Sequence, residues 1–243
     1  VVCVLNPDLI QSIIMQKEKY MSNILISGCG VTFSKQKKPT WGKVLKICGA
    51  NIMDMGGPAV SNEYILNNLL YGLHEHKDVT HVVCQLTTTG KLDVEVNAHR
   101  QNLVRNDPIR NFTYDGIWPS SVSKTSRIKR DYYEWLYSEK IDIDNTLIKL
   151  LALKQFCSNR NIKLLILQGY KIKWPTDNLI LQQLSIDFDY IIYDEYKQSE
   201  YYQYHDYEND NTVPCKEYQK YLAKKINKEF LHLDLDHKFQ KFL

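Results

Sequence analysis

The sequence has no long apolar run, no C-x-x-C pair and little net charge, and each absence argues against a class of protein. No segment approaches the roughly 18 consecutive apolar residues of a membrane-spanning helix. The six cysteines, at positions 3, 29, 48, 84, 157 and 215, include no pair with the spacing of a zinc or redox motif. A formal net charge of +3 is too small to indicate a nucleic-acid partner. We therefore expect no metal, no cofactor, no nucleic acid and no membrane as a partner.

The first twenty residues also lack the basic leader of a signal peptide. Residues 1–5 are apolar and run directly into an Asn-Pro-Asp sequence at 6–8, which is typical of a helix start. We expect residues 1–20 to form a helical appendage and residues 21–243 to form a single domain.

Two cysteines indicate the compartment. Cys84 lies inside an apolar run and Cys157 lies near the end of an apolar helical pattern, which favours buried thiols over disulfides. The sequence therefore predicts a cytoplasmic protein.

The pattern that is present alternates short apolar runs with helical periodicity. The first run, from Asn23, ends in the turn Gly28-Cys29-Gly30. Expected strands lie at about 23–27, 50–55, 81–86, 162–167 and 190–193, and expected helices at about 42–47, 60–73, 128–139, 143–158 and 215–229. This alternation predicts a three-layer α/β/α sandwich of about five parallel strands, of the flavodoxin-like kind.

One long segment, at about 91–127, follows neither pattern and is expected to be an irregular insertion. Loops of this length in compact domains are usually functional or disordered, and the arginine and aromatic content of this one argues against disorder.

Four blocks of the sequence resemble the SGNH/GDSL hydrolases, in the order of that family. Residues 24–33 resemble the first block, a strand ending in Gly-Asp-Ser, and residues 54–59 resemble the second, an Asn-x-Gly-x-x-Gly turn. Residues 82–90 resemble the third block, a strand ending in Gly-x-Asn-Asp, and residues 210–214 resemble the Asp-x-x-His-Pro turn before the last helix. The resemblance covers about residues 22–229.

The resemblance implies where the family's chemistry would lie in this chain. The nucleophilic serine falls on Gly30, its neighbouring aspartate on Cys29, the oxyanion glycine on Ala59, the oxyanion asparagine on Thr89 and the histidine on Val213, while the aspartate before the histidine is matched by Asp210. Neither glycine nor valine supplies a nucleophile or a base.

Other residues offer a substitute set. Cys29 lies one position from the nucleophile and His205 lies eight residues before Val213, so a catalytic set of Cys29, His205 and Asp210 is one interpretation. The alternatives are a small buried thiol at Cys29 and a surface histidine at His205. Gly30 and Ala59 could still donate backbone N–H groups to an anion, and Thr89 could donate its hydroxyl.

Three functions remain open from the sequence. The first is an SGNH-like esterase or carbohydrate acetylesterase with an altered catalytic set, acting on a small-molecule ester. The second is a non-catalytic protein that binds a glycan or an anion in the same cleft, where the arginines and aromatic residues of the insertion would contact it. The third is a nucleotide-binding turn at Gly28-Cys29-Gly30, which lacks the third glycine of G-x-G-x-x-G because Phe33 takes that place.

Overall fold

The structure is a computed structural model of the whole chain. It describes residues 22–28, 40–57, 60–95, 105–106, 113–117, 131–168, 172, 174–175, 177–185, 192–193, 216–233, 235 and 237. All structural statements below concern these residues.

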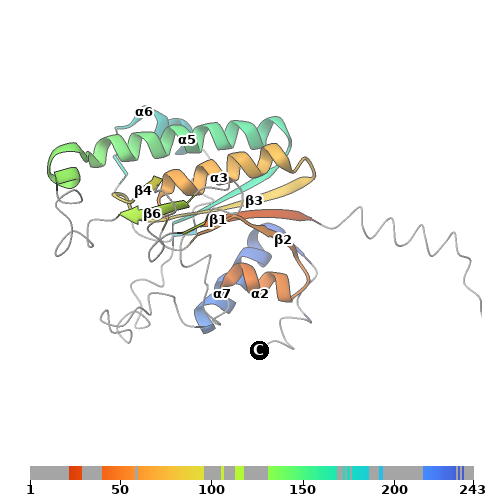
Figure 1. Cartoon of the computed structure of the whole chain (residues 1–243). Helices are drawn as coiled ribbons and strands as arrows, with labels where there is room; N and C mark the ends of the chain where they lie inside the picture. Colours follow the sequence, from red (N-terminus) through yellow and green to blue (C-terminus); the bar gives the residue numbers. More distant parts are fainter. Residues whose placement is uncertain are drawn as a thin grey trace, which may run out of the picture.

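A parallel sheet forms the middle layer (Figure 1). Its strands are β1 (Asn23–Gly28), β2 (Asn51–Asp54), β3 (Val79–Leu86), β7 (Lys163–Gln168) and β8 (Ile192–Tyr193). They lie in the order β2-β1-β3-β7-β8, and each neighbouring pair is parallel. Strands covered on both faces read as continuous apolar runs, which is why the central strands were recognisable in the sequence.

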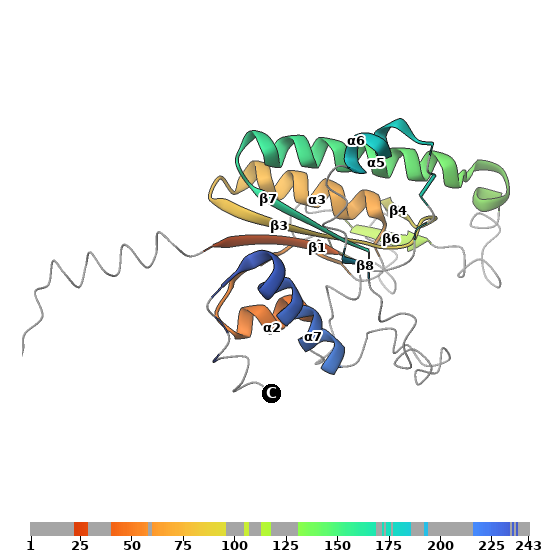
Figure 2. The ribbon, with the colours of Figure 1, turned by 180° about the vertical axis from the view of Figure 1, so that it is seen from behind.

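Helices cover both faces of this sheet. On one face lie α3 (Asn62–Glu75), α5 (Glu139–Asn159) and α6 (Leu179–Ser185). The other face is covered by α2 (Trp41–Ile47) and α7 (Lys216–Ile226), which continues into the π-helical turn η6 (Asn227–Leu231). Figure 2 shows the two helical layers from behind, with the sheet between them. The predicted three-layer α/β/α sandwich with parallel strands is confirmed.

The apolar core divides according to the alternation of side chains along each strand. Leu25, Val82 and Cys84 pack toward α3 and α5, whereas Ile24 and Val83 pack toward α2 and α7. Burial raises the pKa of the Cys84 thiol well above its usual range, and it raises that of Cys157 to about 12. These two thiols are therefore protonated core groups.

Two predicted helices differ from the structure. The helix expected at 128–139 is replaced, within the described residues, by a short π-helical turn η2 (Tyr132–Leu136). The next helix begins four residues earlier than expected, at Glu139, because the Ser138 hydroxyl accepts a hydrogen bond from the Ile141 backbone N–H and caps it. Helix α6 was not predicted. It has seven residues and begins where Asn178 Oδ1 accepts the backbone N–H groups of Ile180 and Leu181.

The segment 91–127, expected to be irregular, contains a small antiparallel sheet. Its strands are β4 (Leu92–Glu95), β5 (Arg105–Asn106) and β6 (Thr113–Ile117), in the order β4-β6-β5. Strands of two to five residues leave too short an alternation to be read from sequence. β4 contacts α3, beside one end of the main sheet (Figure 1). The predicted appendage at 1–20 lies outside the described residues.

None of the described helices is both long enough and apolar enough to cross a membrane.

His81 is a buried histidine near the amino end of β3. Its ring is edge-on to Phe230 of η6, with centroids 5.5 Å apart, and its Nδ1 lies 2.9 Å from the Thr80 hydroxyl. Its Nε2 has no hydrogen-bond partner among the described residues. Burial, with smaller contributions from the charges of Lys163 and His232, lowers the pKa of His81 to about 4. The folded protein therefore holds this ring neutral.

The free energy of unfolding should fall as the pH drops below 6.5. The unfolded chain binds a proton at His81 near pH 6.5, whereas the folded chain does so only near pH 4, so acid favours the unfolded state. Between pH 6.5 and 5 the free energy of unfolding should fall by about 1.6 kcal/mol, because His81 of the unfolded chain is already half protonated at pH 6.5. Urea unfolding at both pH values measures it. A His81→Phe variant should lose this part of the pH dependence, and His74→Gln, at an exposed site, should keep it. An unchanged pH dependence in His81→Phe would refute the assignment.

Candidate functional site at the carboxyl edge of the sheet

The strand order places a candidate site at the carboxyl ends of β1 and β3. In the sheet, β2 lies on one side of β1 and β3 lies on the other side. The connections that follow β1 and β3 therefore lead away from each other. Ligands of open α/β sheets bind where the order reverses in this way. The described residues that border this point are Gly28 at the end of β1 and Leu86 at the end of β3.

The backbone after β2 is fastened to the end of β1. The Met55 N–H donates to Ile26 O at 2.8 Å, and the Gly57 N–H donates to Gly28 O at 3.0 Å. Between them, a Cβ on Gly56 would lie 2.8 Å from Gly28 O, which is closer than real Cβ atoms come. A glycine is therefore needed at position 56 for these two segments to approach so closely.

Ser27, the serine at the end of β1, is a structural residue. Its side chain is fully buried, and its hydroxyl donates to Met55 O at 3.3 Å. The Asn68 amide donates to the same carbonyl at 3.2 Å. The Ser27 hydroxyl thus faces into the protein and is not exposed to a substrate.

Asn62, the first residue of α3, holds the end of β3. Its Oδ1 accepts the Thr87 N–H at 2.7 Å, and its Nδ2 donates to Thr87 O at 3.2 Å. The side chain is 3% exposed. This two-bond contact fixes the turn after β3 against the start of α3.

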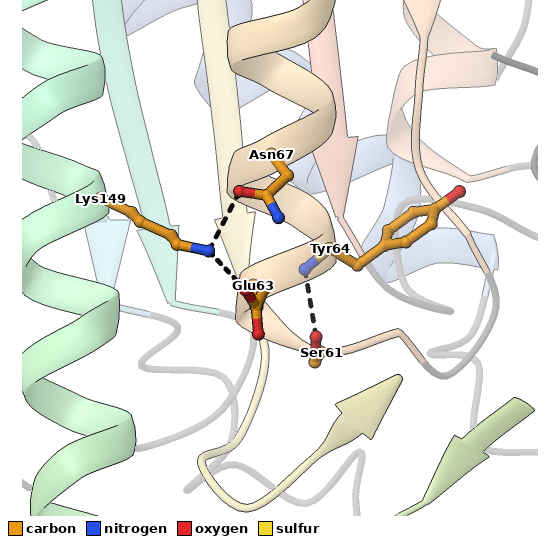
Figure 3. Close-up of polar contacts among 5 residues, drawn as sticks. All are labelled: Ser61, Glu63, Tyr64, Asn67 and Lys149. Carbon is orange, nitrogen blue, oxygen red and sulfur yellow. Dashed lines mark hydrogen bonds and ion pairs between the residues drawn. The ribbon is translucent and has the colours of Figure 1, made fainter. Parts of the chain in front are cut away.

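The start of α3 is fixed in turn by its own cap and by α5 (Figure 3). The Ser61 hydroxyl accepts the Tyr64 N–H at 3.1 Å. From α5, Lys149 Nζ donates to Glu63 Oε1 at 2.6 Å and to Asn67 Oδ1 at 3.1 Å. Helices α3 and α5 therefore hold each other in place beside the site.

The turn after β3 is bound to the first turn of α5. The Thr89 hydroxyl donates to Glu139 Oε1 at 3.2 Å, and the Gly90 N–H donates to Asp142 Oδ2 at 2.6 Å. The Tyr133 hydroxyl donates to Gly90 O. Gly90 has a φ of 82°, a conformation that favours glycine. The predicted oxyanion donor Thr89 thus already donates its hydroxyl hydrogen to a carboxylate.

Burial raises the pKa of Asp142, and the nearby Glu63 and Glu139 carboxylates raise it too, while the Gly90 N–H lowers it. Three tyrosines surround this carboxyl. The rings of Tyr132 and Tyr133 have centroids 5.1 Å apart, and Tyr137 lies 5.4 Å from Tyr133. Burial, with the Asp142 charge second, raises the pKa of Tyr137 to about 12. These phenols are neutral at pH 7, and the hydroxyl groups of Tyr133 and Tyr137 form hydrogen bonds there.

Asp54 ends β2 at the same edge. Its Oδ1 accepts the Gly56 N–H at 2.9 Å. Although the residue as a whole is exposed, protein atoms displace water around its carboxyl and raise its pKa to about 6, against the lowering effect of the Gly56 N–H, Lys43 and Lys46. Carboxyls with a raised pKa occur preferentially at functional sites, which makes Asp54 a candidate proton acceptor beside this edge.

Of the predicted site residues, the structure describes only Thr89. Cys29, Gly30, Ala59, His205 and Asp210 lie outside the described residues, and their roles stay predictions. Among the residues that are described, no group of three or more His, Cys, Asp and Glu side chains is arranged to hold a metal ion.

The sequence did not single out Asn62, Glu139 or Asp142. Asn62 and Glu139 each follow a serine that caps a helix. A capping serine followed by a polar first turn was the sequence feature that could have indicated these residues.

Comparison with known proteins gives a structural similarity and no sequence match. No protein-family model matches the chain, and no curated protein matches it. Among solved structures, it is similar to a psychrotrophic esterase from Pseudoalteromonas sp., determined in a form inhibited by monoethylphosphonate. The identity is 15% over 87% of this chain and 100% of that chain, with a TM-score of 0.46. A similarity of this size assigns neither a family nor an activity, and the fold stated above rests on the sheet order and the helical layers.

Proposed function

We propose that this chain is an SGNH-hydrolase-like protein that binds a carbohydrate at the carboxyl edge of its sheet and does not hydrolyse esters by a serine–histidine mechanism. The resemblance of four sequence blocks supplies the family, and the fold is consistent with it. The family's serine and histidine positions hold Gly30 and Val213.

The observation that carries the proposal is the state of the hydroxyl groups at this edge. A serine nucleophile needs its hydroxyl held by a base and directed at the substrate. Each Ser or Thr hydroxyl described at this edge has a structural hydrogen bond instead; these residues are Ser27, Ser61, Thr87, Thr88 and Thr89. Fixed polar groups, with no activated hydroxyl among the described residues of this edge, favour binding over acyl transfer.

A second candidate function is ester hydrolysis by a thiol. Gly28 ends β1 where the strand order reverses, and Cys29 is the next residue in the sequence. Asp54 ends the neighbouring strand, paired in register with Ile26, and burial around its carboxyl raises its pKa to about 6. Asp54 is then an alternative to His205 as the base that would activate this thiol.

Incubation with p-nitrophenyl acetate and p-nitrophenyl butyrate separates the two functions. The binding proposal expects no turnover above buffer for the wild-type chain, for Cys29→Ala or for Asp54→Asn. Turnover by the wild type that disappears in Cys29→Ala would contradict it and would establish the thiol enzyme. Turnover that survives in Cys29→Ala would contradict both and would indicate another nucleophile.

A further inference from the structure

A cavity of about 790 Å³ lies next to the carboxyl edge, between the first turns of α5 and residues 174–175 and 177–178. Its lining combines an apolar wall of Ile143, Trp174 and Pro175 with the carboxylates of Glu139, Asp144 and Asp177. Small-molecule sites in proteins typically have this size and this mixture of apolar surface with a few polar groups.

We propose that this cavity is a sugar subsite that selects neutral and amino-bearing sugars over acidic ones. The inference rests on the proposed function, because it names the ligand class of that same edge. It concerns recognition, and it requires no reaction at the site.

The cavity is joined to the candidate site through Glu139. This residue lines the cavity, and its Oε1 accepts the hydroxyl hydrogen of Thr89 from the turn after β3. One carboxylate therefore borders both the turn after β3 and the cavity, and a ligand longer than one sugar ring could contact both.

The apolar wall suits the C–H face of a sugar ring. Ile143 is 6% exposed and belongs to the core between the sheet and α5, which gives the wall a rigid backing. Trp174 packs against the same core and contributes its flat indole to the lining, and Pro175 adds the apolar surface of its pyrrolidine ring. Indole rings combine apolar area with little loss of side-chain freedom on binding.

One carboxylate of the rim is held in place. Asn178 Nδ2 donates to Asp144 Oδ1 at 2.6 Å, while Asn178 Oδ1 is fixed by capping α6. A group that is already ordered loses less entropy when it binds a ligand, so Asp144 is a good acceptor for a sugar hydroxyl.

The charges of the lining determine which sugars fit. Among the described lining residues, Glu139, Asp144 and Asp177 each supply a carboxylate, and Lys140 supplies a cation. Carboxylates accept hydrogen bonds from hydroxyl groups and more strongly from ammonium groups, and they repel another carboxylate. The lining thus favours glucosamine over N-acetylglucosamine and disfavours glucuronate.

Binding of glucosamine, N-acetylglucosamine and glucuronate to the full chain, measured by titration calorimetry, tests the inference. We expect glucosamine to bind most tightly and glucuronate to bind at least about tenfold more weakly, a difference of about 1.4 kcal/mol. Trp174→Ala should weaken glucosamine binding by about tenfold. The matched control is Trp135→Ala, at a tryptophan that is 80% exposed on η2, and it should leave the affinity within about twofold.

Asp177→Asn gives an independent test at an exposed residue, where folding is not at risk. It should reduce the preference for glucosamine over N-acetylglucosamine, and high salt should do the same. Equal binding of glucuronate and glucosamine, or unchanged binding in both Trp174→Ala and Asp177→Asn, would overturn the inference.

The two proposals fail in different ways. Thiol-dependent ester turnover together with the expected sugar preference would refute the proposed non-catalytic function and would still support the sugar subsite. If no sugar binds, both the proposed subsite and the proposed carbohydrate ligand are refuted. The ester assay is independent of that result, and a lack of turnover would still argue against the thiol enzyme.

Discussion

Replacement of Trp41 by alanine should lower the free energy of unfolding by about 4 kcal/mol, the largest effect that we expect from a single substitution. Trp41 is the first residue of α2 and is fully buried in the core layer formed by α2, α7 and the sheet. Its indole Nε1 donates to Gln85 Oε1 at 2.9 Å, near the carboxyl end of β3. The change creates a cavity and removes that buried donor, and urea unfolding followed by circular dichroism measures the loss.

Two further variants separate the contributions at this position. Trp41→Phe keeps most of the volume but loses the indole N–H, and should cost about 2 kcal/mol. Trp135→Ala removes the same side chain from an exposed turn and should change stability by less than about 0.5 kcal/mol. A loss below about 1 kcal/mol in Trp41→Ala would show that α2 does not depend on this anchor.

Asn62→Ala should cost about 3 kcal/mol, the second largest effect. It removes both hydrogen bonds to Thr87 and leaves the N–H and C=O of a fully buried residue without these partners. A buried backbone group that loses its partner costs about 1–3 kcal/mol. Chemical denaturation of the variant gives the value.

The control for Asn62 lies on the same helix. Asn67→Ala removes only an acceptor for Lys149, which keeps its bond to Glu63, and should cost less than about 1 kcal/mol. Equal losses in the two variants would mean that the contact with Thr87 has no special role in stability.

The fold was predictable because its central strands are continuous apolar runs. Residues such as Ile24, Leu25 and Val83 are buried whichever face they point to, and only a sheet covered on both sides permits that. Ser138 shows where prediction was weaker, since its capping hydroxyl places the start of α5 at Glu139, four residues before the expected start at 143. The segment 91–127 was harder still, because its short strands owe their place to pairing with one another and not to their own sequence.

The contacts at the candidate site were not predictable from the sequence. The turn that the sequence singled out begins at Gly28, at the end of β1 where the strand order reverses, and the roles of its other residues stay predictions. The partners of Thr89 could not be predicted, because Glu139 lies 50 residues further along the chain and becomes its neighbour only when α5 packs beside β3. For the same reason, a buried pair such as Asn62 and Thr87 has no signature in a single sequence.

The contact between Trp41 and Gln219 has a consequence for the order in which the protein is made. The Trp41 backbone N–H donates to Gln219 Oε1 at 2.7 Å across 178 residues of sequence. Helix α2 and the strands β1 to β3 leave the ribosome well before α7. The apolar face that includes Ile24 and Ile26 therefore stays partly exposed until α7 has been synthesised and packs against it. During synthesis this half of the core stays open to chaperones or to aggregation, whereas the half under α3 and α5 is already complete.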